Sequence, residues 1–198
     1  HWLGTTGRKE SSGDLDLAVD ENAITKEQLF THLKQQGLDV KKSGDSVHIM
    51  APIGGVEGNG YVQTDLMFGD PKWQAFSMQG GKEGTQYTGM SRHIILASIV
   101  SALNPDLKWS YKFGIVNRST NEPVDGGRDP QTLSKVTGIP VNKLGNADDI
   151  LDAIRARPDY NTLVSGARET LGRSNIQLPE SAPLPGTGQW FREMIGKM

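Results

Sequence analysis

The feature that most constrains this chain is a glycine-rich segment that leads directly into a short alternating strand. Residues 4–13 read "GTTGRKESSG", and residues 14–20 read "DLDLAVD", in which aspartate and apolar residues alternate. Strict alternation predicts a half-buried strand, because successive side chains of a strand point to opposite faces. Asp14 and Asp16 therefore share one face, roughly 6.6 Å apart along the strand. Two like charges this close repel each other, so the arrangement favours a bound cation between them.

The composition limits the class of protein. A chain of 198 residues, 35% hydrophobic and 22% charged, is long enough for one well-buried core or two small ones. The absence of cysteine excludes disulfides, thiolate metal sites and cysteine nucleophiles. No apolar run approaches the ~20 residues of a membrane span, and the first residues lack a basic leader and an apolar signal core. We therefore expect a cytoplasmic protein, with a viral or phage origin and the nucleus left open.

Charge is distributed unevenly along the chain. The net charge is -2, whereas nucleic-acid binders usually show a basic face. Residues 1–75 carry 7 Lys and Arg against 11 Asp and Glu, and residues 76–198 carry 14 against 12. The acidic excess thus lies in the half that holds the paired aspartates. It is compatible with bound cations and also with an acidic, solvated surface.

A third aspartate is expected on the same face as the first two. In the segment "YVQTDLMF" (61–68) apolar and polar residues alternate, so the side chain of Asp65 points to the face opposite to that of Thr64 and Leu66. If Leu66 packs on the same side as the leucines of residues 14–20, all three carboxylates emerge together on the other side. Between the two strands, the pattern predicts a helix over 24–37 with a Thr25–Gln28 capping box. Two further strands are expected over 38–42 and 46–51.

The second half of the chain is predicted to be mostly helical. The expected elements are an amphipathic helix over 90–103, a strand over 107–116 paired with 122–125 through a turn at 117–121, helices over 129–138, 146–157 and 160–172, an extended segment over 176–188 and a short terminal helix. The fold class is therefore α+β. We expect three parts: a catalytic core over 1–78, a largely helical region over 79–175 and a proline-rich tail over 176–198.

Three converging carboxylates are a donor set for magnesium, which prefers hard oxygen ligands. Asp14, Asp16 and Asp65 are accordingly the candidate catalytic and metal-binding residues. They are expected to hold two Mg²⁺ ions, with Mn²⁺ as a substitute, in phosphoryl or nucleotidyl transfer. The preceding loop suits a triphosphate, because Gly4 admits close backbone approach, and Thr5 and Arg8 supply a hydroxyl and a cation. An Asp-x-Asp pair alone would favour a solvated edge strand, but the loop and the third aspartate favour the site.

These motifs resemble the signature of the DNA polymerase β nucleotidyltransferase superfamily. In that signature a Gly-Ser loop leads to Asp-x-Asp on one strand, and a third Asp lies on a later strand. The match continues collinearly, since "QYTGMSRHIILASI" (86–99) is similar to the turn and helix that line the nucleotide pocket of family X polymerases. The stretches "LKWSYKFGIVNRSTNEPVD" and "NADDILDAIRARPDY" resemble their thumb. The resemblance covers roughly residues 2–160.

The resemblance implies a fold, partners and further site residues. The fold would be a nucleotidyltransferase palm with a mixed or antiparallel sheet and helices on one face, followed by a thumb-like region. Tyr87 and Gly89 would shape the pocket for a nucleoside triphosphate. Arg92 would lie near the templating position of a DNA primer/template, and the cations Lys108, Lys112 and Arg118 would hold the nucleic-acid backbone. Thr5 stands where the family usually has Ser, and neither a helix-hairpin-helix region nor a lyase domain is present, so the chain resembles a minimal palm-and-thumb member or a fragment.

Other functions are compatible with the same motifs. The same fold can transfer a nucleotide to RNA, to a protein or to a small molecule, and a lapsed site would leave a nucleotide-binding module. His32 and His48 have no evident partner in the sequence and are expected to be structural or surface residues rather than ligands. The template requirement, the sugar preference and the oligomeric state remain open at this point.

Overall fold

The computed structural model describes residues 1–4, 6 and 13–197. Its chain divides into two compact units, His1–Gly80 and Gly81–Met198, and the boundary expected from the sequence lies two residues earlier. The described residues form eight α-helices, a mixed four-stranded sheet and a separate two-stranded sheet. The expected α+β fold class is confirmed. None of the described helices is both long enough and apolar enough to cross a membrane.

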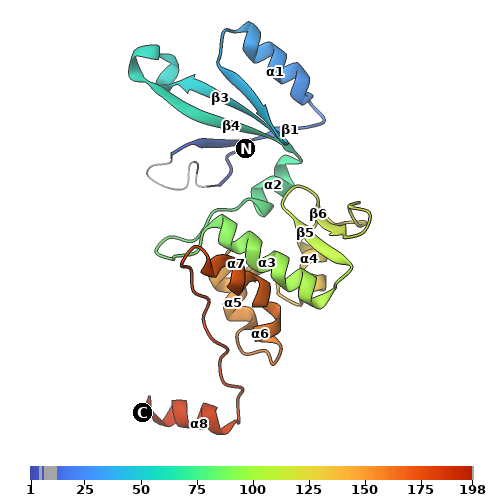
Figure 1. Cartoon of the computed structure of the whole chain (residues 1–198), viewed down its shortest axis with the longest axis vertical. Coiled ribbons are helices and arrows are strands. Elements are labelled where there is room, and N and C mark those ends of the chain that lie inside the picture. Colours follow the sequence, from blue (N-terminus) through green and yellow to red (C-terminus); the bar gives the residue numbers. More distant parts are fainter. Residues whose placement is uncertain (5, 7–12, 198) are drawn as a thin grey trace. The chain divides into compact units, whose positions relative to one another are not determined.

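The first unit is built on the four-stranded sheet (Figure 1). Its strands are β1 (Leu15–Asp20), β2 (Val40–Ser43), β3 (Ser46–Pro52) and β4 (Tyr61–Gly69), in the order β1-β4-β3-β2. β1 runs parallel to β4, whereas the β4–β3 and β3–β2 pairs are antiparallel. The sheet is therefore mixed, and all four predicted strands are confirmed. Two short 3₁₀ turns, η1 (Ile53–Gly55) and η2 (Glu57–Asn59), connect β3 to β4.

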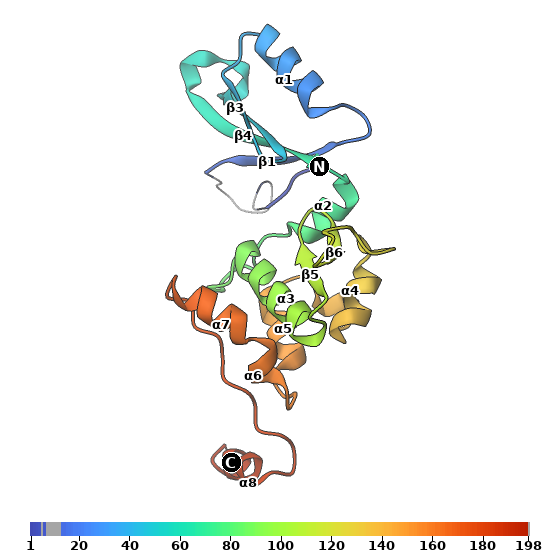
Figure 2. The ribbon, with the colours of Figure 1, turned by 45° about the vertical axis from the view of Figure 1, so that its right-hand side comes forward.

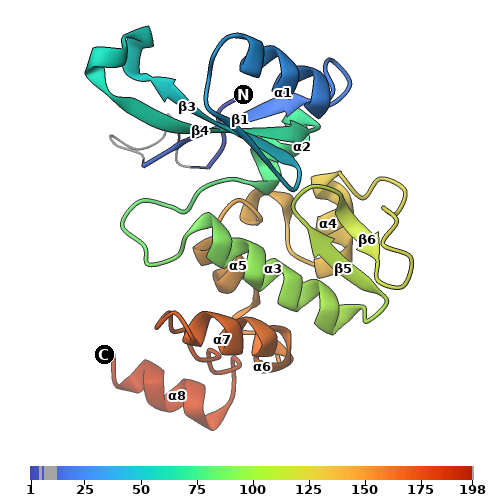
Figure 3. The same ribbon diagram turned by 45° about the horizontal axis from the view of Figure 1, so that its top comes forward.

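Helix α1 (Lys26–Gln35) covers one face of this sheet (Figure 3). It begins at the predicted capping box, in which Gln28 N donates to Thr25 Oγ1 and Thr25 N donates to Gln28 Oε1. The core beneath it consists of Val40, Val47, Leu66 and Phe68, with Leu17, Val19, Ile24, Leu29, Phe30, Leu33, Leu38 and Ile49 packed against them. Because the apolar residues of β1 and β4 point toward α1, their aspartates point to the opposite face.

A second helix of this unit was not predicted. Helix α2 (Pro71–Ser77) follows β4 and contacts β1. Asp70 caps it, since Asp70 Oδ1 accepts hydrogen bonds from Lys72 N and Trp73 N, and Pro71 occupies its first turn. Trp73 is buried. The Asp-Pro pair is a start signal for a helix, the same signal that predicted the helix over 129–138.

Helix α3 (Gly89–Leu103) is the central element of the second unit (Figure 2). It begins with a capping box between Thr88 and Ser91 and contacts α4, α5, α6, α7 and β5. Its buried positions recur on one face, as expected of an amphipathic helix, but the remaining surface is less polar than that prediction implies. Its fully buried residues are Ser91, Arg92, Ile95, Leu96, Ile99 and Val100. Because other elements pack on several of its sides, most of its remaining length is also apolar.

The strand pair of the second unit differs from the prediction. β5 (Leu107–Ser110) pairs antiparallel with β6 (Gly114–Asn117), so the hairpin turns at residues 111–113. Gly114 adopts a φ of 73°, which favours glycine and permits the early turn. Residues 122–125 join only through an isolated bridge between Val116 and Pro123. The expected turn at 117–121 is present and leads from β6 to this bridge, with Asn121 N donating to Asn117 O at 2.9 Å.

The remaining helices follow the prediction with one exception. They are α4 (Pro130–Thr137), α5 (Ala147–Ile154), α6 (Tyr160–Leu163), α7 (Ser165–Gly172) and α8 (Gly188–Ile195), with a 3₁₀ turn η3 (Val141–Lys143) before α5. Asp129 and Asn146 cap α4 and α5 as expected. The single helix expected over 160–172 is instead two helices. Ser98 Oγ donates to Leu163 O at 2.7 Å, so a side chain of α3 binds a backbone carbonyl where the helix breaks.

Candidate metal centre

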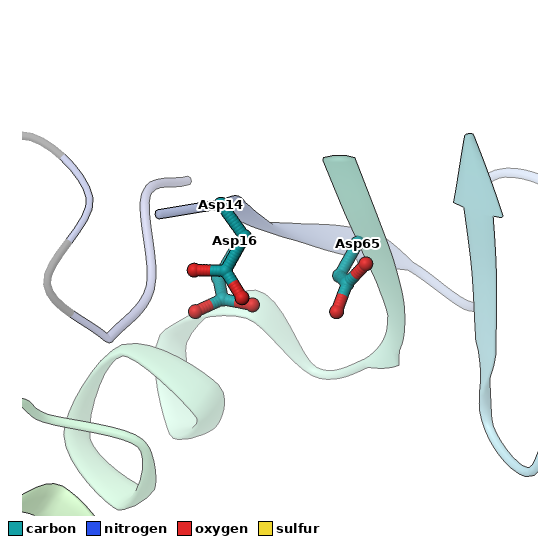
Figure 4. Close-up of side chains that lie close together, drawn as sticks. All are labelled: Asp14, Asp16 and Asp65. Carbon is teal, nitrogen blue, oxygen red and sulfur yellow. The ribbon is translucent and has the colours of Figure 1, made fainter. Parts of the chain in front are cut away.

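Three carboxylates converge on the face of the first unit's sheet that α1 does not cover. Asp16 on β1 is the register partner of Asp65 on β4, and Asp14 lies two residues before Asp16 on the same face. One carboxylate oxygen of each residue lies within 4.8 Å of those of the other two (Figure 4). All three residues are half-buried. The predicted convergence of these residues is therefore observed.

The electrostatics of this cluster favour a positive ligand. The pKa of Asp16 is raised above its ordinary value of 3.8, first by burial and then by the negative charges of Asp14 and Asp65. Ionised Asp16 is thus disfavoured by its burial and by the two neighbouring carboxylates. A divalent cation would reverse this balance, and three carboxylate oxygens are the donors that Mg²⁺ and Mn²⁺ prefer. The residues present therefore fit the metal that the sequence predicts.

The N-terminal segment lies directly against the cluster. Leu3 N donates to Asp16 O at 2.9 Å, and Gly4 N donates to Met78 O at 3.1 Å. Gly4 has a φ of 56°, and a Cβ at this position would lie 2.7 Å from Asp16 Oδ2. Buried Thr6, which the sequence analysis did not single out, accepts a hydrogen bond from Asp16 N through its Oγ1 at 2.9 Å. Gly4 was predicted to approach phosphate, and the structure places it beside a carboxylate of the candidate metal site.

The contact between Gly4 and Asp16 leads to a first prediction. Gly4→Ala should destabilise the protein by about 1–2 kcal/mol, because an L side chain is strained in the left-handed region. It should also weaken Mg²⁺ binding, since the new methyl group displaces the Asp16 carboxylate. Gly44→Ala is the matched control, because Gly44 has a φ of 51° and open space around its Cβ position. Urea unfolding with and without Mg²⁺ measures both effects. Equal Mg²⁺ responses in the two variants would contradict the proposed contact.

Two side chains orient Asp65. His48 lies opposite Asp65 in the β3–β4 register, and its Nδ1 is 2.6 Å from Asp65 Oδ1. Gln63 Nε2 donates to the same oxygen at 3.0 Å. Among the described residues, Asp65 Oδ2 accepts no hydrogen bond, so the two donors hold one oxygen and leave the other for a ligand. The partner of His48 is not evident from the sequence, because it depends on the register of β3 against β4.

His48 supplies a second prediction. His48→Phe removes a hydrogen-bond partner of Asp65 and should lower Mg²⁺ affinity about tenfold while preserving the fold, as is typical of residues that support metal ligands. His48→Gln, which can still donate to Asp65, should retain more of the affinity. His32→Gln, on the exposed side of α1, is the control for loss of a histidine. Calorimetric titration with MgCl₂ gives the three affinities. Unchanged Mg²⁺ binding in His48→Phe would show that Asp65 does not need this support.

The other predicted nucleotide-binding residues are placed as follows. Thr5 and Arg8 lie outside the described residues. Tyr87 and Gly89 belong to the second unit, at the beginning of α3. Tyr87 is buried, and its hydroxyl donates to Gln177 O at 3.1 Å. Tyr87 therefore fastens the segment after α7 to the start of α3.

The four predicted nucleic-acid contacts have different roles in the structure. Arg92 is 1% exposed and its Nε donates to Leu144 O at 2.8 Å, so its side chain lies in the interior of the second unit and not on the surface where a nucleic-acid contact was expected. Arg118 is exposed, but it donates to Pro105 O, Leu107 O and Ser101 Oγ and so braces the end of α3. Lys108 binds Asn121 Oδ1. Lys112 lies at the tip of the β5–β6 hairpin, beside Phe113.

Comparison with known proteins does not assign the chain to a family. No protein-family model matches the chain, and no curated protein matches it significantly.

Proposed function

We propose that this protein is a magnesium-dependent nucleotidyltransferase of the DNA polymerase β type, a small polymerase that adds nucleotides to a DNA 3′ end. The observation that carries the proposal is the convergence of Asp14, Asp16 and Asp65, with one oxygen of each within 4.8 Å of the others. The position of Asp16 and Asp65 as register partners on two adjacent parallel strands, with Gly4 beside Asp16, supports it. The collinear motifs that resemble family X polymerases favour this class over other magnesium-dependent enzymes.

Each residue of the candidate site would have a separate role in such a reaction. Asp16 presents a carboxylate from β1, Asp14 presents one from the residue directly before β1, and Asp65 presents one from β4. His48 and Gln63 fix the orientation of Asp65, and the absence of a side chain at Gly4 keeps space beside Asp16. When bound, Mg²⁺ would lower the pKa of an attacking hydroxyl and neutralise the charge that develops on the triphosphate. The three aspartates would hold the metal where these groups meet.

One experiment tests this function against the other acceptors of the same chemistry. The protein is incubated with Mg²⁺, each labelled deoxy- or ribonucleoside triphosphate, and either single-stranded, primed or gapped DNA or the matching RNA. We expect label on the 3′ end of a DNA strand, and no label with Asp65→Asn. Label found only on RNA, on the protein itself or on a small acceptor would replace the polymerase assignment. No label on any acceptor would contradict a transferase altogether.

A further inference from the structure

Helix α8 presents an apolar face to solvent. Trp190, Phe191, Met194 and Ile195 fall within about 140° of one another around the helix, because each residue turns the chain by about 100°. Phe191 is 53% exposed, Met194 47% and Ile195 71%. A helix of eight residues is marginally stable in water by itself, so most of its stability has to come from the packing of its apolar face. α8 therefore needs a surface that covers this face.

The segment before α8 is fastened to the second unit as far as Ala182. Tyr160 Oη donates to Pro179 O at 2.7 Å, and Ala182 N donates to Arg155 O at 3.0 Å. Residues 183–187 alone connect this anchor to α8 (Figure 1). They include two prolines and span at most about 17 Å, so the connection is short and stiff. A short, stiff connection reduces the conformational freedom that α8 loses when it binds.

The first unit carries a groove with an apolar lining. Leu38, Met50, Pro52 and Tyr61 line it, the exposed Glu57 adds a carboxylate, and its volume is about 380 Å³. Pro52 of β3 and Tyr61 of β4 are register partners, so regular sheet supports the groove. Met50 and Tyr61 are both exposed. We call this the β3–β4 groove.

Further apolar side chains are exposed next to the β3–β4 groove. Ile53 directly follows Pro52 in the chain, Val56 directly precedes Glu57, and both are about half exposed. Contiguous apolar surface with a polar rim is typical of a protein–protein contact. The β3–β4 groove therefore has the chemistry that the apolar face of α8 requires.

The charges of α8 and of the β3–β4 groove are complementary. Arg192 is exposed and lies about 60° beyond Ile195 around α8, so it borders the apolar face. In the part of the chain that the structure describes, neither Arg192 nor Glu57 forms an ion pair. Residues 1–75 carry 7 Lys and Arg against 11 Asp and Glu, so the first unit is acidic. Opposite charges at the edge of an apolar contact fix its register.

We propose that α8 of one copy of this chain docks in the β3–β4 groove of a second copy, with its apolar face on Met50 and Tyr61 and with Arg192 beside Glu57. One helix of eight residues covers less than the ~1,200 Å² that specific interfaces bury. Reciprocal exchange of α8 doubles the buried area and closes the assembly as a two-fold symmetric dimer. A lipid surface fits less well, because such helices carry many cations and the polar face of α8 includes Glu193. The inference is independent of the proposed enzymatic function.

Sedimentation velocity of the full chain in EDTA, from about 1 to 100 µM, measures the monomer–dimer equilibrium. We expect a reversible dimer with a Kd in this range. Ile195→Asp places a charge in the covered face and should raise the Kd about tenfold or more, and Tyr61→Ser should do the same from the groove. Leu184→Asp is the matched control, because Leu184 is an exposed apolar residue of the same segment outside α8 and should leave the Kd unchanged.

Charge reversal tests the pairing of α8 with the β3–β4 groove. Arg192→Glu and Glu57→Arg should each raise the Kd about tenfold at low salt, since each brings like charges together. The two substitutions combined should restore the Kd to within about threefold of the wild type. Lys143→Glu, at an exposed cation elsewhere in the second unit, should not rescue Glu57→Arg.

Circular dichroism establishes that each variant is folded, and Glu57→Arg tests the groove independently if Tyr61→Ser does not fold. A wild type that stays monomeric at the highest concentration would overturn the inference, whether α8 is free or folds back on its own chain. A dimer that Ile195→Asp leaves intact would overturn it too, as would charge reversals that do not rescue each other. Binding of the monomer to phosphatidylserine vesicles through α8, without dimerisation, would replace the second copy by a membrane.

Discussion

Asp65→Asn is expected to lower the rate of nucleotide transfer by about three orders of magnitude while leaving the fold intact. In the proposed reaction the loss follows because each carboxylate contributes charge to a site whose bound metal would stabilise the transition state by several kcal/mol, and about 1.4 kcal/mol corresponds to a tenfold change in rate. Asn keeps the size of the side chain, so the β1–β4 pairing and the core beneath α1 should persist. Single-turnover assays at saturating nucleotide measure the rate of the chemical step.

The control for this variant is Asp39→Asn. Asp39 is an exposed aspartate of the same unit and lies outside the carboxylate cluster. Its substitution changes the net charge by the same amount and should leave the transfer rate within about twofold of the wild type, since distant surface charges contribute little. A transfer rate that is equally reduced in both variants would point to net charge rather than to a metal-binding role of Asp65.

Asp16→Asn is expected to stabilise the metal-free protein at neutral pH. The pKa of Asp16 is raised in the folded state, so ionised Asp16 favours the unfolded chain; this cost builds up as the pH rises above 3.8 and is complete above the folded-state pKa. The advantage of the variant should therefore shrink as the pH falls toward the ordinary value of 3.8, where the carboxyl is neutral in both states. Urea unfolding in EDTA across this pH range measures the difference in the free energy of unfolding.

Magnesium should reverse the order of stability of the same two proteins. A ligand that binds only the folded state at 100 times its dissociation constant stabilises it by about 2.7 kcal/mol. The wild type should gain this amount, and Asp16→Asn should gain little. If Asp16→Asn were less stable than the wild type in EDTA at neutral pH, this would contradict the claim that ionised Asp16 lowers the free energy of unfolding of the metal-free protein.

The elements that hold the candidate site were predictable because they depend on local patterns. Alternation alone places Asp16 and Asp65 on faces opposite to Leu17 and Leu66, and it predicts the same face for both aspartates once the apolar residues share one core. Capping residues such as Thr25 likewise determine the start of a helix from a few neighbouring positions. These features needed no knowledge of how distant segments meet.

The features that were missed depend on contacts between segments far apart in the sequence. His48 meets Asp65 because of the β3–β4 register, which alternation within one strand does not specify. Arg92 lies on the face of α3 that the rest of the second unit covers, and its sequence context does not distinguish a buried arginine from an exposed one. The early turn of the β5–β6 hairpin depends on the close approach of Gly114 to Gly127.

Direct binding of a divalent cation tests the central claim, that Asp14, Asp16 and Asp65 form a metal site. Mn²⁺ serves as the probe, because the free ion is quantified by electron paramagnetic resonance during titration of the full chain. We predict saturable Mn²⁺ binding that Mg²⁺ competes away, that is lost in Asp16→Asn and in Asp65→Asn, and that persists in Asp39→Asn. Absence of saturable binding to the wild type, or equal binding to all four proteins, would contradict the metal site.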